Sequence, residues 1–421
     1  MDFDDTPEEA AFRAEAYDWL SRHASPRRAG SGGPVTVGEA DAEAELLHVK
    51  QSKEWQRTLY DGGWAGITWP RQLGGRGGTA DQALIFAQEQ ARFDVPSSVF
   101  AQGIGMAGPT IMGHGTEAQQ DRFLPPMLRG DEVWCQLFSE PGAGSDLANL
   151  STRAERDGDV WVVNGQKVWT SSAHFSDWGI LLARTDVDAP KHRGITYFLL
   201  DMRSPGIEIR PLRQATGASH FNEVFLTNVA IPAANVVGGV NDGWRVTVTT
   251  LANERMFIGG SPTTGDPFAG LAALAASRGR RADPAARQSL MQAYIRLQVM
   301  KYLGWRTQTA LSRGQQPGPE SSVLKLAISE HQARNGDLVM QLLGAEGTLL
   351  DYSGHQASGW QLQFLGQFGS RIGGGTEEVQ RNIIGERVLG LPGEPRVDKD
   401  VPFRSIPKQG APIPSEKGNA R

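Results

Sequence analysis

The hydrophobic period of this 421-residue chain changes twice, and the change restricts the folds open to it. Up to about residue 130, apolar residues recur at helical spacing. From about Val133 to Pro232 the pattern becomes typical of strands, and after Gly243 helical spacing returns until about Leu389. The sequence therefore predicts a β unit between two helical units.

Within the β unit, the run Val160–Val163 leads into Asn164-Gly165, a dipeptide typical of two-residue hairpin turns. We expect a hairpin whose second strand contains Lys167–Thr170. Further β-like runs are expected at 179–183, 195–200 and 223–226.

The expected domains follow from these changes of period. They are a helical domain over 1–130, a β domain over 131–240, a helical domain over 241–393 and an extended or disordered tail over 394–421. Prolines at 395, 402, 407, 412 and 414 support the last assignment. Glycine and proline predict breaks in the second helical unit near 262–267, 314–319 and 373–375.

Composition excludes several classes of protein. The formal net charge of −5 and the lack of a basic stripe argue against nucleic-acid binding. No apolar run approaches the roughly 18 residues that a membrane span needs. Cys135 is the single cysteine, so no internal disulfide can form, and a cytoplasmic location is expected. The acidic N-terminus also lacks the apolar region of a secretion signal.

The common catalytic motifs are missing. We find no phosphate-binding P-loop, no Gly-x-Gly-x-x-Gly turn after a strand, and no Gly-x-Ser-x-Gly. The eight histidines are scattered, without the spacing of metal ligands, so no metal site is predicted. If the chain is an enzyme, an organic cofactor is expected to supply the chemistry.

Three segments are candidates for holding such a cofactor. The loop Ser139–Asp146 combines small hydroxyl residues with glycines that allow close approach to a flat ligand. The strand end 166–172 places Trp169 beside hydroxyls. The glycine turn 373–375 opens a helix whose N–H groups suit an anionic or carbonyl group. Taken alone, a loop like the first is commonly a tight turn, a tryptophan like Trp169 is commonly a core residue, and a glycine turn like the third can be only a linker between helices. The order of the three segments across an α-β-α chain favours a ligand site.

Over residues 5–393 the chain resembles the acyl-CoA dehydrogenase family. Ser139–Asp146 looks like the family's first signature, and Gly375–Arg387 looks like its second. The resemblance implies an α+β multidomain fold with an N-terminal helical domain, a middle β-barrel and a C-terminal four-helix domain. It also implies an FAD cofactor, an oligomer whose FAD sites lie between subunits, and an electron-transfer flavoprotein as the electron acceptor.

The resemblance also assigns candidate site residues. Those lining the flavin ring would be Gln136, Phe138, Ser139, Trp169 and Ser171. Those meeting the rest of FAD would be Thr376 and Glu378, with Gln341 and Gly344 contributed to a neighbouring subunit. Those near the substrate would be Ser145, Arg255, Gly374 and Gly375. The family's usual FAD-phosphate arginine motif is missing, and Arg278, Arg280 or Arg281 could replace it.

The general base is where the sequence departs from many relatives. In the family a Tyr-Glu-Gly-Thr turn often carries the base, but Gly374 occupies the matching position here. A minority of the family carries the base on the first helix of the C-terminal domain, where this chain has Glu254 on an expected apolar stripe with Trp244, Val248, Leu251 and Ile258. The alternative is an ion pair of Glu254 with Arg255 or another cation.

The leading interpretation is α,β-dehydrogenation of an acyl-CoA, with a pocket that Gly374 widens for bulky, branched or long acyl groups. Two alternatives remain open. One is a flavin oxidase or monooxygenase on the same fold, and the other is a non-catalytic subunit that completes FAD in a heteromeric dehydrogenase.

Overall fold

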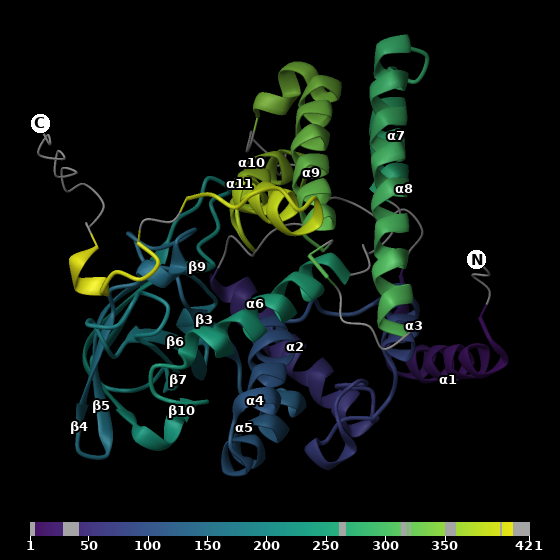
Figure 1. The fold of residues 1–421 in the computed structure, drawn as a ribbon. Helices are drawn as coiled ribbons and strands as arrows, with labels where there is room; N and C mark the ends of the chain where they lie inside the picture. Colours follow the sequence, from purple (N-terminus) through teal and green to yellow (C-terminus); the bar gives the residue numbers. More distant parts are fainter. Residues whose placement is uncertain are drawn as a thin grey trace, which may run out of the picture.

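The computed structural model describes residues 5–27, 42–260, 267–312, 318–319, 321–349, 359–395 and 398–406. A β domain lies on one side of the molecule, with helices from both ends of the chain beside it (Figure 1). This arrangement confirms the predicted order of helical, β and helical units.

The N-terminal helices start where the sequence supplies capping residues. Thr6, Thr79 and Thr116 each accept a hydrogen bond from the backbone N–H three residues later, and the side chain of that residue bonds back to the threonine N–H. The helices are α1 (Pro7–His23), α2 (Ala42–Asp61), α3 (Ala80–Gln90), α4 (Gly108–His114) and α5 (Glu117–Arg129). Trp64 stacks on Phe86 in their shared core, with ring centroids 4.8 Å apart.

The β domain is one sheet of eight strands among the described residues. Its strands are β3 (Trp134–Leu137), β4 (Arg153–Asp157), β5 (Val160–Ser171), β6 (Trp178–Arg184), β7 (Ile195–Asp201), β8 (Ile207–Leu212), β9 (Phe221–Pro232) and β10 (Val236–Val237). The order is β10-β7-β6-β4-β5-β9-β8, and β3 pairs in parallel with β6. A separate short pair joins β1 (Ser25–Pro26) to β2 (Phe93–Asp94).

The predicted hairpin at Asn164-Gly165 is wrong. β5 runs through this dipeptide without turning. The hairpin forms earlier in the chain, where Gly158 (φ +57°) connects β4 to β5. Gly165 has extended backbone, and a Cβ there would lie 2.4 Å from Thr152 Oγ1. The glycine therefore allows β5 to lie close to Thr152, the residue before β4, instead of reversing the chain.

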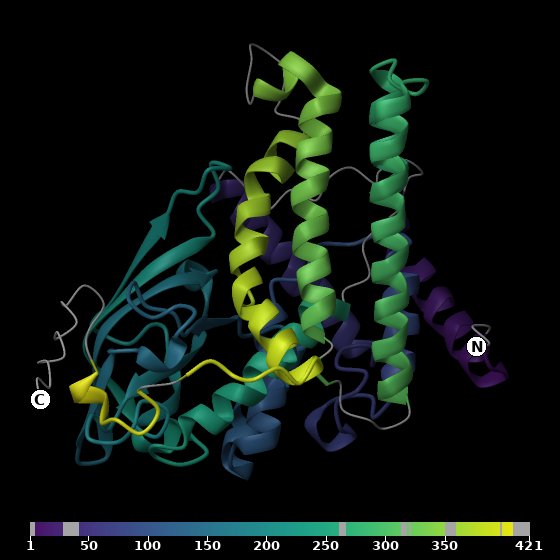
Figure 2. The same ribbon diagram turned by 45° about the horizontal axis from the view of Figure 1, so that its top comes forward.

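The C-terminal helices include two long ones that pack beside one another (Figure 2). They are α6 (Gly243–Gly260), α7 (Pro267–Ser277), α8 (Pro284–Ser312), α9 (Ser321–Leu343), α10 (Gly359–Ile372) and α11 (Glu377–Ile383). Leu271, Ala293 and Val339 belong to the core between α7, α8 and α9. The predicted break at 373–375 is confirmed, whereas those near 262–267 and 314–319 fall largely outside the described residues.

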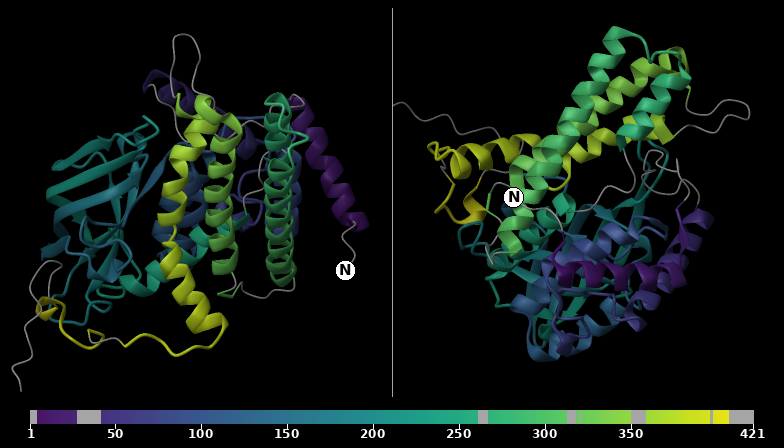
Figure 3. Two further views of the ribbon diagram at one scale, coloured as in Figure 1. Left: turned by 90° about the horizontal axis from the view of Figure 1, so that it is seen from above. Right: turned by 90° about the vertical axis from the view of Figure 1, so that its right-hand side faces the viewer.

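The segment 394–421 was expected to be extended or disordered, but part of it is folded onto the β domain. Residues 398–406 contain a short 3-10 helix, Phe403–Ser405, beside the sheet (Figure 3). Phe403 N–H donates to Ala189 O at 2.9 Å, and Arg404 N–H donates to Val187 O at 3.0 Å. The composition of this segment did not predict its folding, because the residues that it contacts, Val187 and Ala189, lie far away in the sequence.

Candidate functional site

The loop Ser139–Asp146, which we call the ligand loop, follows β3 and is anchored by a buried ion pair. Lys167 Nζ on β5 donates to Glu140 Oε1 at 2.8 Å and to Phe138 O at 3.0 Å. The Glu140 carboxylate also accepts from the backbone N–H groups of Ser151 at 2.7 Å and Thr152 at 2.9 Å. These bonds fix the start of the loop against the stretch that follows it.

Burial alone would raise the pKa of Glu140, but Lys167 and the backbone donors outweigh it and lower the pKa. The carboxylate is therefore ionised at neutral pH. Sequence reasoning missed this pair. The sequence did carry a signal for the buried lysine. Side chains alternate between the two faces of a strand, and Lys167 is an even number of residues from the apolar Trp161 and Val163, which places it on the same, buried face.

An irregularity in β5 shapes the next part of the site. The register with β9 shifts between Lys167 and Thr170, and Trp169 there has φ +62° and a side chain that is 61% exposed. A bulky residue with positive φ stores backbone strain, and such strain gathers at functional sites. Val168 N–H donates to Ser139 O at 3.0 Å, so the bulge and the ligand loop are held together.

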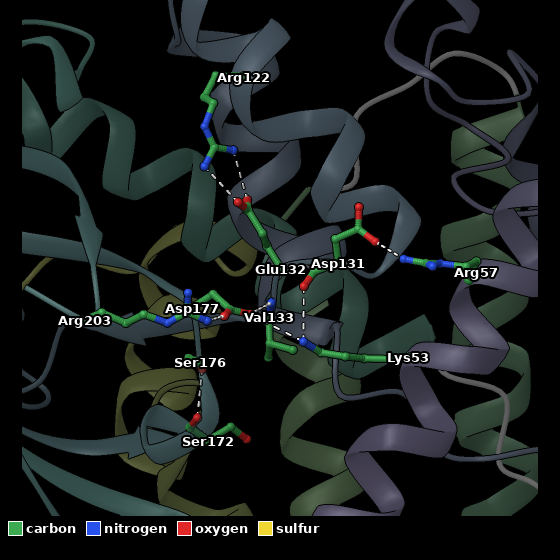
Figure 4. A network of polar contacts seen from close by, with 10 residues as sticks. All are labelled: Lys53, Arg57, Arg122, Asp131, Glu132, Val133, Ser172, Ser176, Asp177 and Arg203. Atoms are coloured by element: carbon green, nitrogen blue, oxygen red, sulfur yellow. Dashed lines mark hydrogen bonds and ion pairs between the residues drawn. The ribbon is translucent and has the colours of Figure 1, made fainter.

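A polar network ties the start of β3 and the turn after β5 to the N-terminal helices (Figure 4). Ser171 ends the strand, and in the turn that follows Ser176 Oγ donates to Ser172 O at 2.8 Å. Asp177 Oδ2 accepts from Val133 N–H at 2.9 Å and lies 3.6 Å from Lys53 Nζ of α2. The Asp177 carboxylate therefore ties the start of β3 to α2, while the Ser176–Ser172 bond holds the turn that follows β5.

Glu254 on α6 faces β3. Gln136 Nε2 donates to Glu254 Oε2 at 3.5 Å, which brings together the predicted base and a predicted flavin-lining residue. The expected apolar stripe is only partly buried, because Leu251 packs against the core while Val248 is 52% exposed. Arg255 lies on α6, and its side chain is outside the described part of the structure.

A buried lysine near Glu254 was not predicted. Lys325 on α9 is 4% exposed, and its Nζ donates to Ser370 O at 2.8 Å. Burial lowers the pKa of Lys325 against the opposing effect of the Glu377 and Glu254 carboxylates. No local pattern in the sequence predicts this burial, because the neighbours of Lys325 come from α6, α10 and α11.

The glycine turn depends on its glycines. Gly374 has φ +68° and Gly375 has φ +88°, conformations that residues with a side chain rarely adopt. The buried side chain of Gln380 donates from Nε2 to Gly374 O at 3.0 Å, and a Cβ on Gly375 would lie 2.6 Å from the same nitrogen. Thr376 caps α11 by accepting from Val379 N–H at 3.2 Å.

Two predicted FAD residues lie far from this turn. Lys325, near the start of α9, bonds to the end of α10, whereas Gln341 follows 16 residues later on α9 (341 − 325). At 1.5 Å per residue the separation is about 24 Å. Gly344 directly follows the C-terminal end of α9, beyond Gln341. Gln341 and Gly344 are therefore too distant to join the glycine turn of their own chain.

Phe138, another predicted flavin-lining residue, is 3% exposed and belongs to the core, whereas the remaining predicted residues are at the surface. Ser145 and Glu378 are exposed. Arg278 pairs with Glu346 at 2.6 Å, and Arg280 pairs with Asp283 at 2.5 Å, so two of the three candidate phosphate ligands already have carboxylate partners, and the third, Arg281, is exposed. In the described part of the chain, no group of three or more His, Cys, Asp or Glu could hold a metal ion. None of the described helices is long and apolar enough to cross a membrane.

The residues near the β5 bulge fit a flat, partly polar ring. The exposed ring of Trp169 offers an apolar surface, and the ring of Phe221 stands edge-on to it with 6.2 Å between the ring centroids. The half-buried residues Ser139 and Ser171 lie on the two joined segments and carry hydroxyls that can donate or accept. The donor set therefore suits an isoalloxazine ring, with no acidic cluster that would favour a metal.

Comparison with known proteins agrees with this arrangement. The N-terminal, middle and C-terminal domain models of acyl-CoA dehydrogenases match residues 6–131, 135–229 and 241–389. Acyl-CoA dehydrogenase IpdE1 of Mycobacterium tuberculosis is 39% identical over 388 residues, covering 91% of this chain and 98% of the relative. Acyl-CoA dehydrogenase FadE34 of the same organism is 43% identical over 353 residues, covering 84% of this chain and 48% of the relative.

Solved structures give the same result. Tcur3481-Tcur3483 steroid ACAD matches with a TM-score of 0.77 at 28% identity, covering 94% of this chain and all of that one. The ChsE4-ChsE5 complex from Mycobacterium tuberculosis matches with a TM-score of 0.75 at 30% identity, with the same coverage. The fold, the three matched domain models and the relative IpdE1, matched over 98% of its length, together show that this chain is an oxidoreductase of the acyl-CoA dehydrogenase family.

Proposed function

We propose that the chain catalyses FAD-dependent dehydrogenation of a bulky acyl-CoA between Cα and Cβ to the trans-2-enoyl-CoA, with Glu254 as the general base. The observation that carries this proposal is the contact of the Glu254 carboxylate with Gln136, at 3.5 Å, beside the candidate flavin site. Gly374, at the family's commoner base position, has no side chain that could compete for the role.

Each residue would have a distinct part in the reaction. FAD, when bound, supplies the hydride acceptor for the β-hydrogen. Glu254 would remove the α-proton, and Gln136 would orient its carboxylate. Backbone N–H groups of the glycine turn would hold the thioester oxygen, which makes the α-proton more acidic.

A bulky acyl group is favoured by the glycine turn. Gly374 leaves the space that a glutamate would occupy in many relatives. The similarity to Tcur3481-Tcur3483 steroid ACAD supports the same class, because a fused-ring acyl group needs more room than a straight chain. We therefore propose polycyclic or branched acyl-CoA thioesters as the first substrates to test.

An oligomer would complete the site. Gln341 and Gly344 are too far from their own glycine turn, so they would serve the FAD of a second subunit. A stripe of exposed apolar residues on α8 offers a surface for such a partner, namely Met291, Tyr294, Ile295, Val299 and Tyr302. The similarity to the ChsE4-ChsE5 complex supports a related chain as partner, with a homo-oligomer as the alternative. An electron-transfer flavoprotein is the proposed electron acceptor.

Anaerobic reduction of the flavin by a panel of acyl-CoA thioesters tests the proposal. The panel would include short straight-chain, long straight-chain, branched and fused-ring acyl groups. We expect bleaching of the flavin absorbance, fastest with the bulky thioesters. Glu254→Gln should slow reduction by about 100- to 10,000-fold, since this is the usual contribution of a general base. Glu117→Gln, which removes an exposed carboxylate at the start of α5, is the matched control and should reduce at the wild-type rate.

The alternatives give different results. Reduction of Glu254→Gln at the wild-type rate would rule out Glu254 as the base. A flavin that no acyl-CoA reduces would indicate a non-catalytic subunit, while oxygen consumption with peroxide release would indicate a flavin oxidase.

A further inference from the structure

The C-terminal segment 398–406 covers a buried arginine of the β domain. Arg184, at the end of β6, is 2% exposed, and the ring centroid of Phe403 lies 3.8 Å from its guanidinium carbon. Arg184 donates to Ala148 O at 2.6 Å and to Lys191 O at 2.6 Å. The guanidinium therefore connects the stretch after the ligand loop to the backbone of Lys191, and the C-terminal segment covers it.

The same segment reaches the ligand loop through a shared lysine. Lys191 Nζ lies 3.0 and 2.9 Å from the two carboxylate oxygens of Asp146 and 2.5 Å from Asp398 Oδ2. Lys191 is 7% exposed, whereas the Asp146 side chain is 54% exposed. Burial would lower the pKa of Lys191, but the two carboxylates outweigh it and raise the pKa, so the ammonium group is charged at neutral pH.

The two ends of the ligand loop are held differently. Its start is fixed by the buried Glu140–Lys167 pair, while Gly144, Ser145 and Asp146 at its end are exposed. The Asp146 carboxylate is anchored by Lys191, and Lys191 is held in turn by Asp398, 207 residues further along the chain. The geometry of the loop end therefore depends on the C-terminal segment.

We propose that Lys191 is a positioning residue for acyl-CoA binding and that the C-terminal segment 398–406, through Asp398, holds Lys191 in place. This inference rests on the proposed function, because it assigns the end of the ligand loop to the CoA side of the substrate. Loss of Asp398 would leave one lysine with one carboxylate and a looser loop. Loss of Lys191 would leave Asp146 and Asp398 facing one another as like charges.

Hydrogen–deuterium exchange of the full chain tests the positioning, because it needs no turnover. In Asp398→Asn and Lys191→Gln, the amides of residues 139–150 should exchange about tenfold faster than in the wild type. Arg404→Gln is the matched control, since it removes an exposed ion pair of the same segment with Asp188 and does not touch Lys191. Its exchange over residues 139–150 should equal that of the wild type.

Steady-state kinetics then test the role in binding. In Asp398→Asn the KM for the best acyl-CoA should rise about fivefold while kcat stays within about twofold, and Lys191→Gln should show an equal or larger rise in KM. A structural role alone would lower kcat together with the melting temperature and leave no separate effect on KM.

Three results would overturn the inference. The first is unchanged exchange over residues 139–150 in both variants, which would show that the segment does not position the loop. The second is faster exchange with an unchanged KM, which would separate the loop end from the substrate. The third is a joint loss of kcat and thermal stability. If no acyl-CoA reduced the wild-type flavin, the proposed function would fail first, and the exchange result would still decide the positioning.

Discussion

Removing one partner of the Glu140–Lys167 pair would leave the other charge buried alone. The side chains are 8% and 0% exposed, so water cannot replace the lost partner. We expect Glu140→Gln or Lys167→Met to lower the free energy of unfolding by about 3–5 kcal/mol. The double variant should cost less than the sum of the two single changes, because it leaves no unpaired charge.

Urea denaturation of the full chain measures this effect, with retained flavin as a second readout. Glu208→Gln, which breaks the exposed pair of Glu208 with Arg210, is the control and should leave the denaturation midpoint unchanged. Additive losses in the double variant would show that Glu140 and Lys167 stabilise the protein separately.

At the scale of elements, the contact between α8 and α9 should make stability depend on pH. His331 on α9 is 6% exposed and lies beside Arg296 of α8, with 3.4 Å between Arg296 Nε and His331 Nδ1. Burial, followed by the charge of Arg296, lowers the pKa of His331 from 6.5 to about 4. The folded protein therefore keeps the imidazole neutral at a pH where the unfolded chain already binds a proton.

The sign follows from linkage. Above pH 6.5 the imidazole is neutral in both the folded and the unfolded state, so His331 adds no pH dependence to the free energy of unfolding. Below pH 6.5 the unfolded state binds the proton first. The free energy of unfolding should fall between pH 6.5 and about 4, by roughly 3 kcal/mol in total at 1.36 kcal/mol per pH unit. His331→Gln should lack this component when the two proteins are compared by urea denaturation from pH 8 to pH 4. Parallel pH profiles would contradict the assignment.

At the scale of the whole molecule, FAD binding should depend on assembly. Since Gln341 would serve the cofactor of a second subunit, dilution below the dissociation constant of the oligomer should release FAD. Gln341→Ala should weaken FAD binding about fivefold, the loss expected for one hydrogen bond, without changing the fold. Ultracentrifugation with flavin absorbance detection follows both quantities.

Gln51→Ala, an exposed glutamine of α2, is the control for that substitution and should bind FAD as the wild type does. If Gln341→Ala bound FAD with unchanged affinity in the oligomer, the assignment of α9 to the neighbouring site would be wrong.

The sequence by itself determined the order of the domains and several local features. Hydrophobic period predicted the β runs at 179–183 and 195–200, which form β6 and β7, and the break at 373–375 lies between α10 and α11. These features depend on neighbours close in sequence. Thr79, for example, caps α3 through residues only three positions away. The α+β fold with a central β domain was predictable for the same reason.

Only the tertiary structure decided which distant residues meet. Asn164-Gly165 carries the local signal of a turn, yet β5 pairs with β9 on both sides of this dipeptide and continues through it. Lys167 shows the same limit, since its partner Glu140 comes from the ligand loop and not from its own strand. Asp398 reaches Lys191 across the chain, although its surroundings in the sequence are those of a tail.

The candidate base combines both sources. The sequence placed Glu254 on a helix, because that depends on residues within a few turns. Only the fold could bring Gln136 of β3 to within 3.5 Å of it, because that contact spans 118 residues of chain. Local chemistry determined which residues were available, and long-range packing decided which of them share a site.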